Sequence, residues 1–201
     1  MNAVTIRKDE KNPPRERILA VASELFYRQG IRAVGVESIA EAAGTNKMTL
    51  YRHFTSKDEL VAEYLRRLAA EAVTHFEALK AAHPGKPCET LRAWLTEMAS
   101  HVASGDERGC PLSNAAVELP DKEHPARKVI EELKTTQRNQ LISICEAANL
   151  SEPDLLADEL FLLLEGARVM AQSTGPAGMD KRLQRMGDAL IRSHEQEAAA
   201  R

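Results

Sequence analysis

The stretch that most constrains the fold is Val36–Lys57, VESIAEAAGTNKMTLYRHFTSK. Apolar residues recur at helical spacing on both sides of a glycine, at Ile39, Ala40 and Ala43 before it and at Leu50 and Phe54 after it. Two short helices joined at a glycine are the pattern of a helix-turn-helix. Gly44 can adopt the positive φ that such a turn requires. Asn46 is suited to cap the second helix, because its side-chain oxygen can accept a free backbone N–H.

The second helix of this stretch presents a polar outer face. If Leu50 and Phe54 face inward, a turn of 100° per residue directs the intervening side chains outward. These are Met48, Thr49, Tyr51 and Arg52, with Lys47 and His53 on the flanks. Such side chains offer hydrogen-bond donors to phosphates and base edges and methyl groups to thymine. The pattern indicates DNA recognition in a major groove, although a solvated helix of an ordinary bundle shows the same pattern.

Three segments carry a resemblance to a known family: RERILAVASELFYRQG, IAEAAG and TLYRHFTSKDEL. Together they span Arg15–Leu60, which resembles the N-terminal domain of the TetR family of bacterial transcriptional regulators. The resemblance implies that Tyr51, His53 and Lys57 contact DNA phosphates. It also implies that Lys47, Met48, Thr49 and Arg52 lie at or near base edges.

Two positions depart from the family pattern. Gly35 stands where many members have threonine, so a hydroxyl that often meets a phosphate is missing. Glu37 stands where a basic or neutral residue is common. Glu37 either accepts a hydrogen bond from a cytosine amine or adjusts the charge of its helix. We favour the second role, because glutamate contacts to cytosine are the rarer direct readout.

Composition narrows the class of protein. The chain has 201 residues, of which 43% are hydrophobic and 28% charged, as expected for a globular protein of one or two domains. It has no apolar run of membrane-spanning length and no signal-peptide pattern, and we expect a cytoplasmic protein. Three cysteines without a CxxC motif argue against a disulfide framework or a zinc site, and we expect no metal and no cofactor.

Charge is distributed unevenly along the chain. Residues 1–57 contain ten Lys or Arg against six Asp or Glu, a balance of +4. Residues 58–201 contain seventeen against twenty-four, a balance of −7. A basic first domain on an acidic second domain is typical of a DNA reader whose second domain does not touch DNA. Arg7, Lys8 and Lys11 precede the first helix, in an arm that either touches the DNA backbone or is solvated.

The apolar periods predict an all-α protein of about nine helices and no strand. The expected helices span about 13–29, 36–43, 47–54, 58–80, 88–104, 111–119, 125–149, 155–174 and 179–193. Asn12 and Ser151 are the expected caps of the first and eighth. We expect a three-helix DNA-binding domain over 1–57 and a helical bundle for ligand binding and dimerisation over 58–201.

The penultimate helix, ADELFLLLEGARVMAQ, is apolar on more than one face. A helix apolar nearly all round is buried on both sides. One side can meet its own bundle, and the other can pair, together with the last helix, with a second copy in a four-helix interface. The resemblance also implies a homodimer through the last two long helices. The alternative is a central core helix in a monomer.

The resemblance further implies a pocket for a small-molecule effector in the second domain. The candidate lining residues are Trp94, Met98, His101, Cys110, Asn114, Glu165 and Met170. Each has a simpler explanation that stays open. The tryptophan and the methionines can be core filling, the histidine a helix-end residue, and the glutamate the partner of Arg168 three residues further along its helix.

Cys110 allows a different mode of regulation. It immediately precedes Pro111, the expected first residue of a helix, and Arg108 is close in sequence. A helix N-terminus and a cation make a thiol more reactive, which suits a sensor of oxidants or electrophiles. The alternative is a small buried hydrophobe.

These observations predict a ligand-responsive repressor that binds a near-palindromic operator as a homodimer and is released when a small molecule occupies the second domain. A thiol sensor using Cys110 on the same scaffold is the alternative. An all-helical enzyme using Cys110 or His101 is disfavoured, because the sequence contains no paired acid–base constellation, phosphate loop or HExxH motif. A DNA binder without sequence preference is disfavoured by the acidic second domain.

Overall fold

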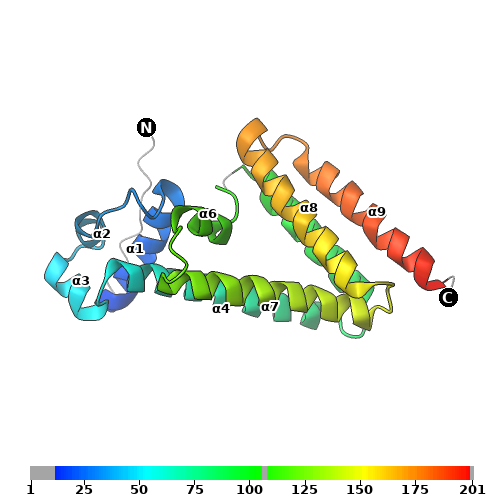
Figure 1. The fold of residues 1–201 in the computed structure, drawn as a ribbon, viewed down its shortest axis with the longest axis horizontal. Helices are drawn as coiled ribbons and strands as arrows, with labels where there is room; N and C mark the ends of the chain where they lie inside the picture. The colour runs from blue at the N-terminus through cyan, green and yellow to red at the C-terminus, as the bar shows by residue number, and fades with distance from the viewer. Residues whose placement is uncertain (1–11, 106–107, 200–201) are drawn as a thin grey trace. The chain divides into compact units, whose positions relative to one another are not determined.

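The computed structural model describes residues 12–105 and 108–199, and this part of the chain consists of helices joined by turns, with no strand (Figure 1). The helices are α1 (Pro14–Gln29), α2 (Val36–Ala42), α3 (Lys47–His53), α4 (Lys57–Ala82), α5 (Pro87–Ala103), α6 (Pro111–Glu118), α7 (Pro125–Ala147), α8 (Pro153–Thr174) and α9 (Met179–Ala199). The expected all-α fold is confirmed. Arg7, Lys8 and Lys11 lie outside the described residues. No described helix is both long and apolar enough to cross a bilayer.

The helices divide into two compact units. Within the described residues, the first unit runs to Ala69 and includes Pro111–Glu131, and the second contains Ala70–Cys110 and the chain from Glu132 onward. Helices α4 and α7 therefore each contribute residues to both units. The expected domains, 1–57 and 58–201, divide the chain at a single point, whereas the spatial units exchange segments of the chain. The assignment of DNA binding to the first domain and of ligand binding to the second stays a prediction.

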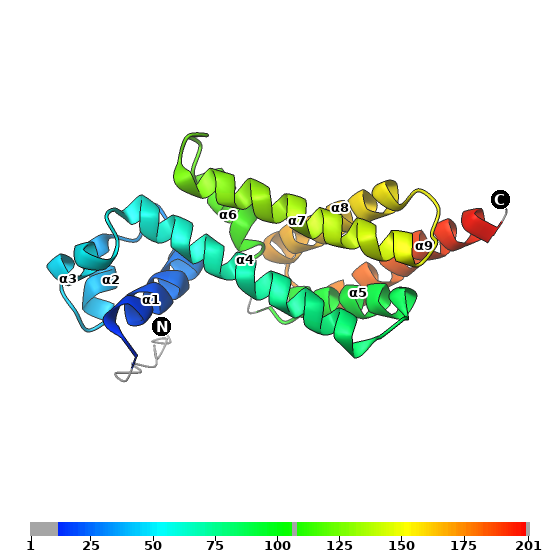
Figure 2. The ribbon, with the colours of Figure 1, turned by 90° about the horizontal axis from the view of Figure 1, so that it is seen from below.

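The first unit contains the helix-turn-helix, and Figure 2 shows α1, α2 and α3 grouped beside the first turns of α4. Its largest fully buried side chains are Ile18, Ile39, Leu50, Phe54, Leu60 and Leu65. Gly44 has φ +64° between α2 and α3, as expected for the turn. Asn46 caps α3, because its Oδ1 accepts a hydrogen bond from the Thr49 backbone N–H at 2.9 Å.

The start of α1 differs from the expectation. Pro13, not Asn12, is the N-cap, and no side chain caps the helix. Pro14 takes the first helical position. Because proline has no backbone N–H, one fewer free N–H group at the helix start needs a hydrogen-bond acceptor from a capping side chain. At the other end Gly30 closes the helix, with φ +94° and its N–H donating to the Phe26 carbonyl at 3.0 Å.

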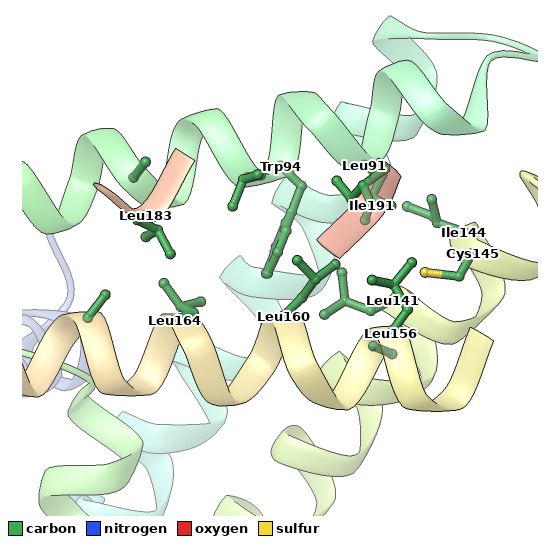
Figure 3. Packing of buried hydrophobic residues seen from close by; sticks show 14 of the residues in the cluster. Leu91, Trp94, Leu141, Ile144, Cys145, Leu156, Leu160, Leu164, Leu183 and Ile191 are labelled. Carbon is green, nitrogen blue, oxygen red and sulfur yellow. The ribbon is translucent and has the colours of Figure 1, made fainter. Parts of the chain in front are cut away.

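The second unit has a core to which five helices contribute. Helix α9 packs against α5 and α8, and α7 and the end of α4 add further apolar side chains. Figure 3 shows Trp94 of α5 directed toward Leu160 of α8. A Cβ on Gly187 of α9 would lie 2.5 Å from a Leu95 methyl group, so glycine is what allows α9 to lie this close to α5.

The start of α8 also differs from the expectation. Glu152, in the left-handed region with φ +45°, is the N-cap, and Ser151 does not cap the helix. Ser151 is buried and its groups are used by His194 of α9, whose Nδ1 lies 2.5 Å from the Ser151 carbonyl oxygen. The other ring nitrogen of His194 lies 3.2 Å from Glu159 Oε2. The serine therefore joins the α7–α8 turn to α9.

Candidate nucleic-acid interface and effector cavity

The outer face of α3 carries the predicted DNA-binding side chains. Leu50 is fully buried and the following Phe54 is buried beneath it, which confirms the predicted orientation of the helix. Met48 is 78% exposed and adds an apolar side chain to this outer face. Lys47, Tyr51 and Arg52 are exposed, and Thr49, His53 and Lys57 are half-buried.

An ion pair crosses from α2 to this face. Lys47 Nζ lies 2.6 Å from Glu37 Oε1, and 5.9 Å from the centre of the Tyr51 ring. The hydrogen bond from Lys47 holds the pKa of the Glu37 carboxyl below its usual value, and the same bond raises the pKa of Lys47. Glu37 thus neutralises one cation of the recognition helix.

A variant of the capping box, in which Glu59 bonds Thr55 and not the N–H of Ser56, fixes the turn between α3 and α4. Ser56 Oγ accepts from the Glu59 backbone N–H at 3.0 Å, and Glu59 Oε2 accepts from the Thr55 N–H and hydroxyl at 2.5 and 2.6 Å. The Thr55 hydroxyl bond is the main cause of the lowered pKa of Glu59. Lys57, the first residue of α4, has a lowered pKa because it is partly desolvated. Lys57 is the first residue of α4, and the free backbone N–H groups at this helix start favour binding of an anion such as a DNA phosphate.

Helix α1 is tied to α4 by charged and aromatic contacts. Arg15 donates to Glu63 at 2.8 Å and its guanidinium lies 5.1 Å from the centre of the Phe54 ring. The Arg15 hydrogen bond lowers the pKa of Glu63, against the opposing effect of burial. The rings of Phe26 and Tyr64 pack at 5.8 Å between centroids. These contacts fix α1 and α4 around the end of α3.

Within the same unit, α6 contacts the turn after α1. Glu118 Oε2 accepts from the Arg32 backbone N–H at 2.9 Å. A Cβ on Gly30 would lie 3.0 Å from the same carboxylate. Glu118 was not among the predicted site residues, because a glutamate at the end of a short helix has no distinguishing sequence signal.

A cavity of about 90 Å³ lies in the second unit. Its lining comes from α4, α5, α7 and α8, and consists of Ala72, His75, Phe76, Trp94, Met98, Gln137, Gln140, Leu141, Phe161, Leu164 and Arg168. A second cavity of about 270 Å³ adjoins it and shares Phe76 and Gln140 as a wall. The lining is mostly apolar and aromatic with a few polar groups, which is the usual character of a small-molecule site.

A charged cluster stands at the α8 side of this cavity. Glu165 Oε1 accepts from Lys134 Nζ at 2.9 Å and from Arg168 Nη1 at 3.1 Å. Lys134 Nζ also lies 5.0 Å from the centre of the Phe161 ring and 3.5 Å from Cys110 Sγ. Two cations thus share one carboxylate in a partly buried place.

The guanidinium of Arg168 is incompletely paired. Among the residues that the structure describes, its buried Nε has no hydrogen-bond partner. Its Nη2 meets the Met98 sulfur at 4.0 Å, a weak acceptor. A buried donor left unsatisfied costs about 1–3 kcal/mol, more if charged.

The structure brings only some of the predicted effector residues together. Trp94 and Met98 line the cavity, and Glu165 is one contact away through Arg168. Cys110 joins this group through Lys134, whose Nζ lies 3.5 Å from its Sγ. The other three do not line it: His101 is exposed, with Nδ1 at 2.9 Å from the Glu97 carbonyl, Met170 is exposed on α8, and Asn114 lies in the first unit.

Several lining residues were missed. Gln137 and Gln140 lie on the inward stripe of α7 and line the cavity. Leu133 and Leu141, which flank them on this stripe, are both buried. Polar residues on an otherwise apolar helix stripe could have indicated in the sequence that this part of α7 lines a cavity. Phe76 and Phe161 had none, because an aromatic residue in a core and one in a cavity wall look the same in sequence.

A helix-turn-helix with an exposed recognition helix, followed by a helical bundle that encloses a cavity, defines the class of helix-turn-helix regulators. The family described as "Bacterial regulatory proteins, tetR family" matches residues 18–64, and "Tetracyclin repressor-like, C-terminal domain" matches residues 87–186. The chain belongs to the TetR family of bacterial regulatory proteins.

Relatives and solved structures agree with this assignment. The chain is 31% identical over 102 residues to the regulator AcrR of Shigella flexneri, covering 50% of this chain and 47% of that protein. It is 31% identical over 127 residues to LmrA of Bacillus subtilis, covering 59% and 63%. The curated relatives are thus matched over only about half to two thirds of their length.

Solved structures match over nearly the whole chain. A protein of Streptomyces avermitilis assigned as a TetR-type regulator has a TM-score of 0.80 at 33% identity, with 92% of this chain and 99% of that chain covered. A TetR-family regulator of Streptomyces coelicolor has a TM-score of 0.83 at 23% identity, covering 90% and 95%.

Proposed function

We propose that the chain is a repressor that binds a near-palindromic operator as a homodimer and is released when a small molecule occupies its second domain. The observation that carries the proposal is the outer face of α3, where Met48 and basic side chains are exposed above a fully apolar underside. Tyr51, His53 and Lys57 contact phosphates in this account, and Lys47, Met48, Thr49 and Arg52 reach base edges.

Selection of duplexes from random DNA by the full chain tests the operator. Two recognition helices related by two-fold symmetry read half-sites about 34–36 Å apart, about one helical turn. We therefore expect an inverted repeat with that spacing. Enrichment of single half-sites or of no sequence at all would contradict the proposal.

A stripe on α8 supports the homodimer. Leu155, Leu162 and Val169 recur every seven residues and are 46%, 73% and 60% exposed. Gly166 lies on the same stripe, and a Cβ there would meet nothing within 4 Å. Glycine in a helix costs about 1 kcal/mol relative to alanine, and close approach of a second helix is a reason to keep it. Exposed Met186 adds to the apolar surface of α9.

Sedimentation of two matched variants tests this interface. Leu162→Glu places a charge on the stripe and is expected to shift the protein from dimer to monomer. Val117→Glu changes a side chain that is 83% exposed on α6, away from the stripe, and is expected to remain dimeric. A dimeric Leu162→Glu protein, or a monomeric wild type at micromolar concentration, would argue against an α8 interface.

Release by an effector requires a difference in affinity. A ligand changes DNA binding only if it prefers the conformation that fits the operator poorly, in which the two recognition helices are spread. The 90 Å³ cavity of the second unit is the site we assign to the effector, because it combines aromatic walls with an unsatisfied buried donor, Arg168 Nε.

A second candidate function is a thiol sensor, and one contact favours it. Cys110 Sγ lies 3.5 Å from Lys134 Nζ, and an adjacent cation is typical of reactive cysteines. Cys145 is the internal control, because burial raises its pKa to about 12. Mass spectrometry after limited peroxide treatment is expected to find Cys110 oxidised before Cys145, together with altered DNA affinity that Cys110→Ser prevents. Equal oxidation of both, or unaltered affinity, would eliminate the sensor.

A further inference from the structure

The wall of the cavity contains a cation, Arg168, that shares its counter-charge with a second cation. Lys134 and Arg168 share the single carboxylate of Glu165. Glu97 of α5 is half-buried and lies 2.7 Å from His75 Nε2, so its carboxylate is used by another residue of the wall. Counted among the described residues, the three side chains of this cluster carry two positive charges and one negative charge at the edge of an apolar space, which favours an anionic occupant and disfavours a cationic one.

The free part of Arg168 has a specific shape. Nη1 is used by Glu165, and the opposite edge, formed by Nε and Nη2, meets only the Met98 sulfur. Two parallel N–H groups on one guanidinium edge match the two oxygens of a carboxylate. Met98 lines the cavity, so a ligand that displaces its flexible side chain reaches this edge.

The rest of the cavity accepts a ring. Trp94, Phe76 and Phe161 line it, and aromatic side chains pack favourably against a flat aromatic ligand. An apolar cavity of about 150 Å³ holds benzene, so a single ring fits the present 90 Å³ only after a shift of a side chain such as Met98. Substituents can extend past Phe76 and Gln140 into the adjoining 270 Å³.

We propose that the effector is a small aromatic carboxylic acid, whose carboxylate replaces the Met98 sulfur on the Nε–Nη2 edge of Arg168 while its ring lies against Trp94. This inference rests on the proposed function, since it names the class of ligand for the effector cavity. It goes further by assigning one arginine edge as the determinant of ligand charge.

Trp94 is the only tryptophan of the chain, so its fluorescence reports directly on the cavity. Full-length protein is titrated with benzoate, phenylacetate and 3-phenylpropanoate, and with the amide of each. Acetate, which lacks the ring, is the further control. We expect saturable quenching by at least one acid, with an affinity about tenfold or more above that of its amide, because a charge-assisted pair is lost in the amide.

Two arginine variants separate binding from folding. Arg168→Met keeps the length of the side chain but removes the edge, and is expected to bring the acid down to the affinity of its amide. Arg138→Met removes a half-buried arginine of α7 that pairs with Asp158 and does not line the cavity, and is expected to leave the acid preference unchanged. Thermal unfolding of both variants shows whether each is folded before it is titrated.

Four results would overturn the inference: no quenching by any acid, equal affinity for acid and amide, an unchanged acid preference in Arg168→Met, or acetate binding as well as the aromatic acids. DNA anisotropy is measured separately in the presence of the bound acid. An acid that binds through Arg168 without weakening DNA binding leaves the ligand class standing and refutes release. DNA binding that fails in the absence of any acid refutes the proposed function alone.

Discussion

The two units place their charged residues in opposite ways. In the helix-turn-helix, Lys47 and Glu37 pair on the outside of an apolar core. In the second unit, Lys134, Glu165 and Arg168 are partly buried against aromatic rings and a cavity. A solvated charge contributes little to stability and remains available to a partner, whereas a partly buried charge needs a counter-charge. Substitutions in the Lys47–Glu37 pair should therefore affect DNA binding, whereas substitutions in the Lys134–Glu165–Arg168 cluster should affect both stability and ligand choice.

The largest expected change in stability distinguishes the buried face of α3 from its exposed face. Phe54→Ala removes a ring that is 1% exposed, and is expected to lower the free energy of unfolding by about 3–5 kcal/mol. Met48→Ala, on the opposite face, should leave stability within about 0.5 kcal/mol while weakening operator binding. Guanidinium unfolding followed by circular dichroism measures both. A stable Phe54→Ala protein would contradict the buried orientation.

Glu165→Ala tests the partly buried cluster. It leaves Lys134 and Arg168 without their shared carboxylate, and we expect a loss of about 1–2 kcal/mol, less than for a fully buried pair because all three side chains retain some solvent contact. The matched control is Glu77→Ala, which removes an exposed pair with Lys80 and should cost at most about 0.5 kcal/mol. Equal losses in thermal unfolding would show that the cluster behaves as a surface network.

The pH dependence of stability sharpens the comparison within the first unit. Arg15 lowers the pKa of Glu63 below its ordinary 4.5, so the folded state binds this proton more weakly than the unfolded state. The stabilisation is present above pH 4.5 and is lost as the pH falls through the lowered folded pKa.

Glu63→Gln should therefore reduce stability at pH 7 by at most about 1 kcal/mol and flatten the loss between pH 5 and 3. Urea unfolding at several pH values measures this, with Glu77→Gln as the control. If Glu63→Gln retains the wild-type slope, the Arg15 contact does not contribute in solution.

The smallest effect is a gain. Glu37→Gln removes a negative charge from the DNA-facing surface and frees Lys47 from its partner. Because both side chains are exposed, we expect DNA affinity to rise only about two- to fivefold, at all sequences alike. Anisotropy with operator and scrambled duplexes measures the change. A gain confined to one base pair of the operator would instead identify Glu37 as a base reader.

The sequence was sufficient for the helix-turn-helix because its determinants are local. Leu50 and Phe54 set the rotation of α3, and Gly44 and Asn46 set its start, all within a dozen residues. The two caps that were wrong, Asn12 and Ser151, failed because a neighbouring proline or a distant partner took over: Pro14 made a cap unnecessary, and His194 claimed Ser151.

The cavity could not be predicted in the same way. Phe76, Trp94, Gln140 and Arg168 come from four helices separated by long stretches of chain, and periodicity assigns each only to an inward face. Whether inward residues fill space or leave it depends on how the helices pack. The pairing of Arg168 with Glu165 was predictable because the two residues are three apart on one helix. The lack of a hydrogen-bond partner at Arg168 Nε was not predictable.

The most direct test of the account is fluorescence anisotropy on the DNA that flanks the chain's own gene. A scrambled duplex is measured in parallel near physiological salt, with wild type and Tyr51→Ala side by side. The account predicts tight binding to the flanking DNA, weak binding to the scrambled duplex, and a loss of about 1–2 kcal/mol in Tyr51→Ala. Equal, weak binding to both duplexes, followed by no enrichment from random DNA, would contradict DNA recognition by α3.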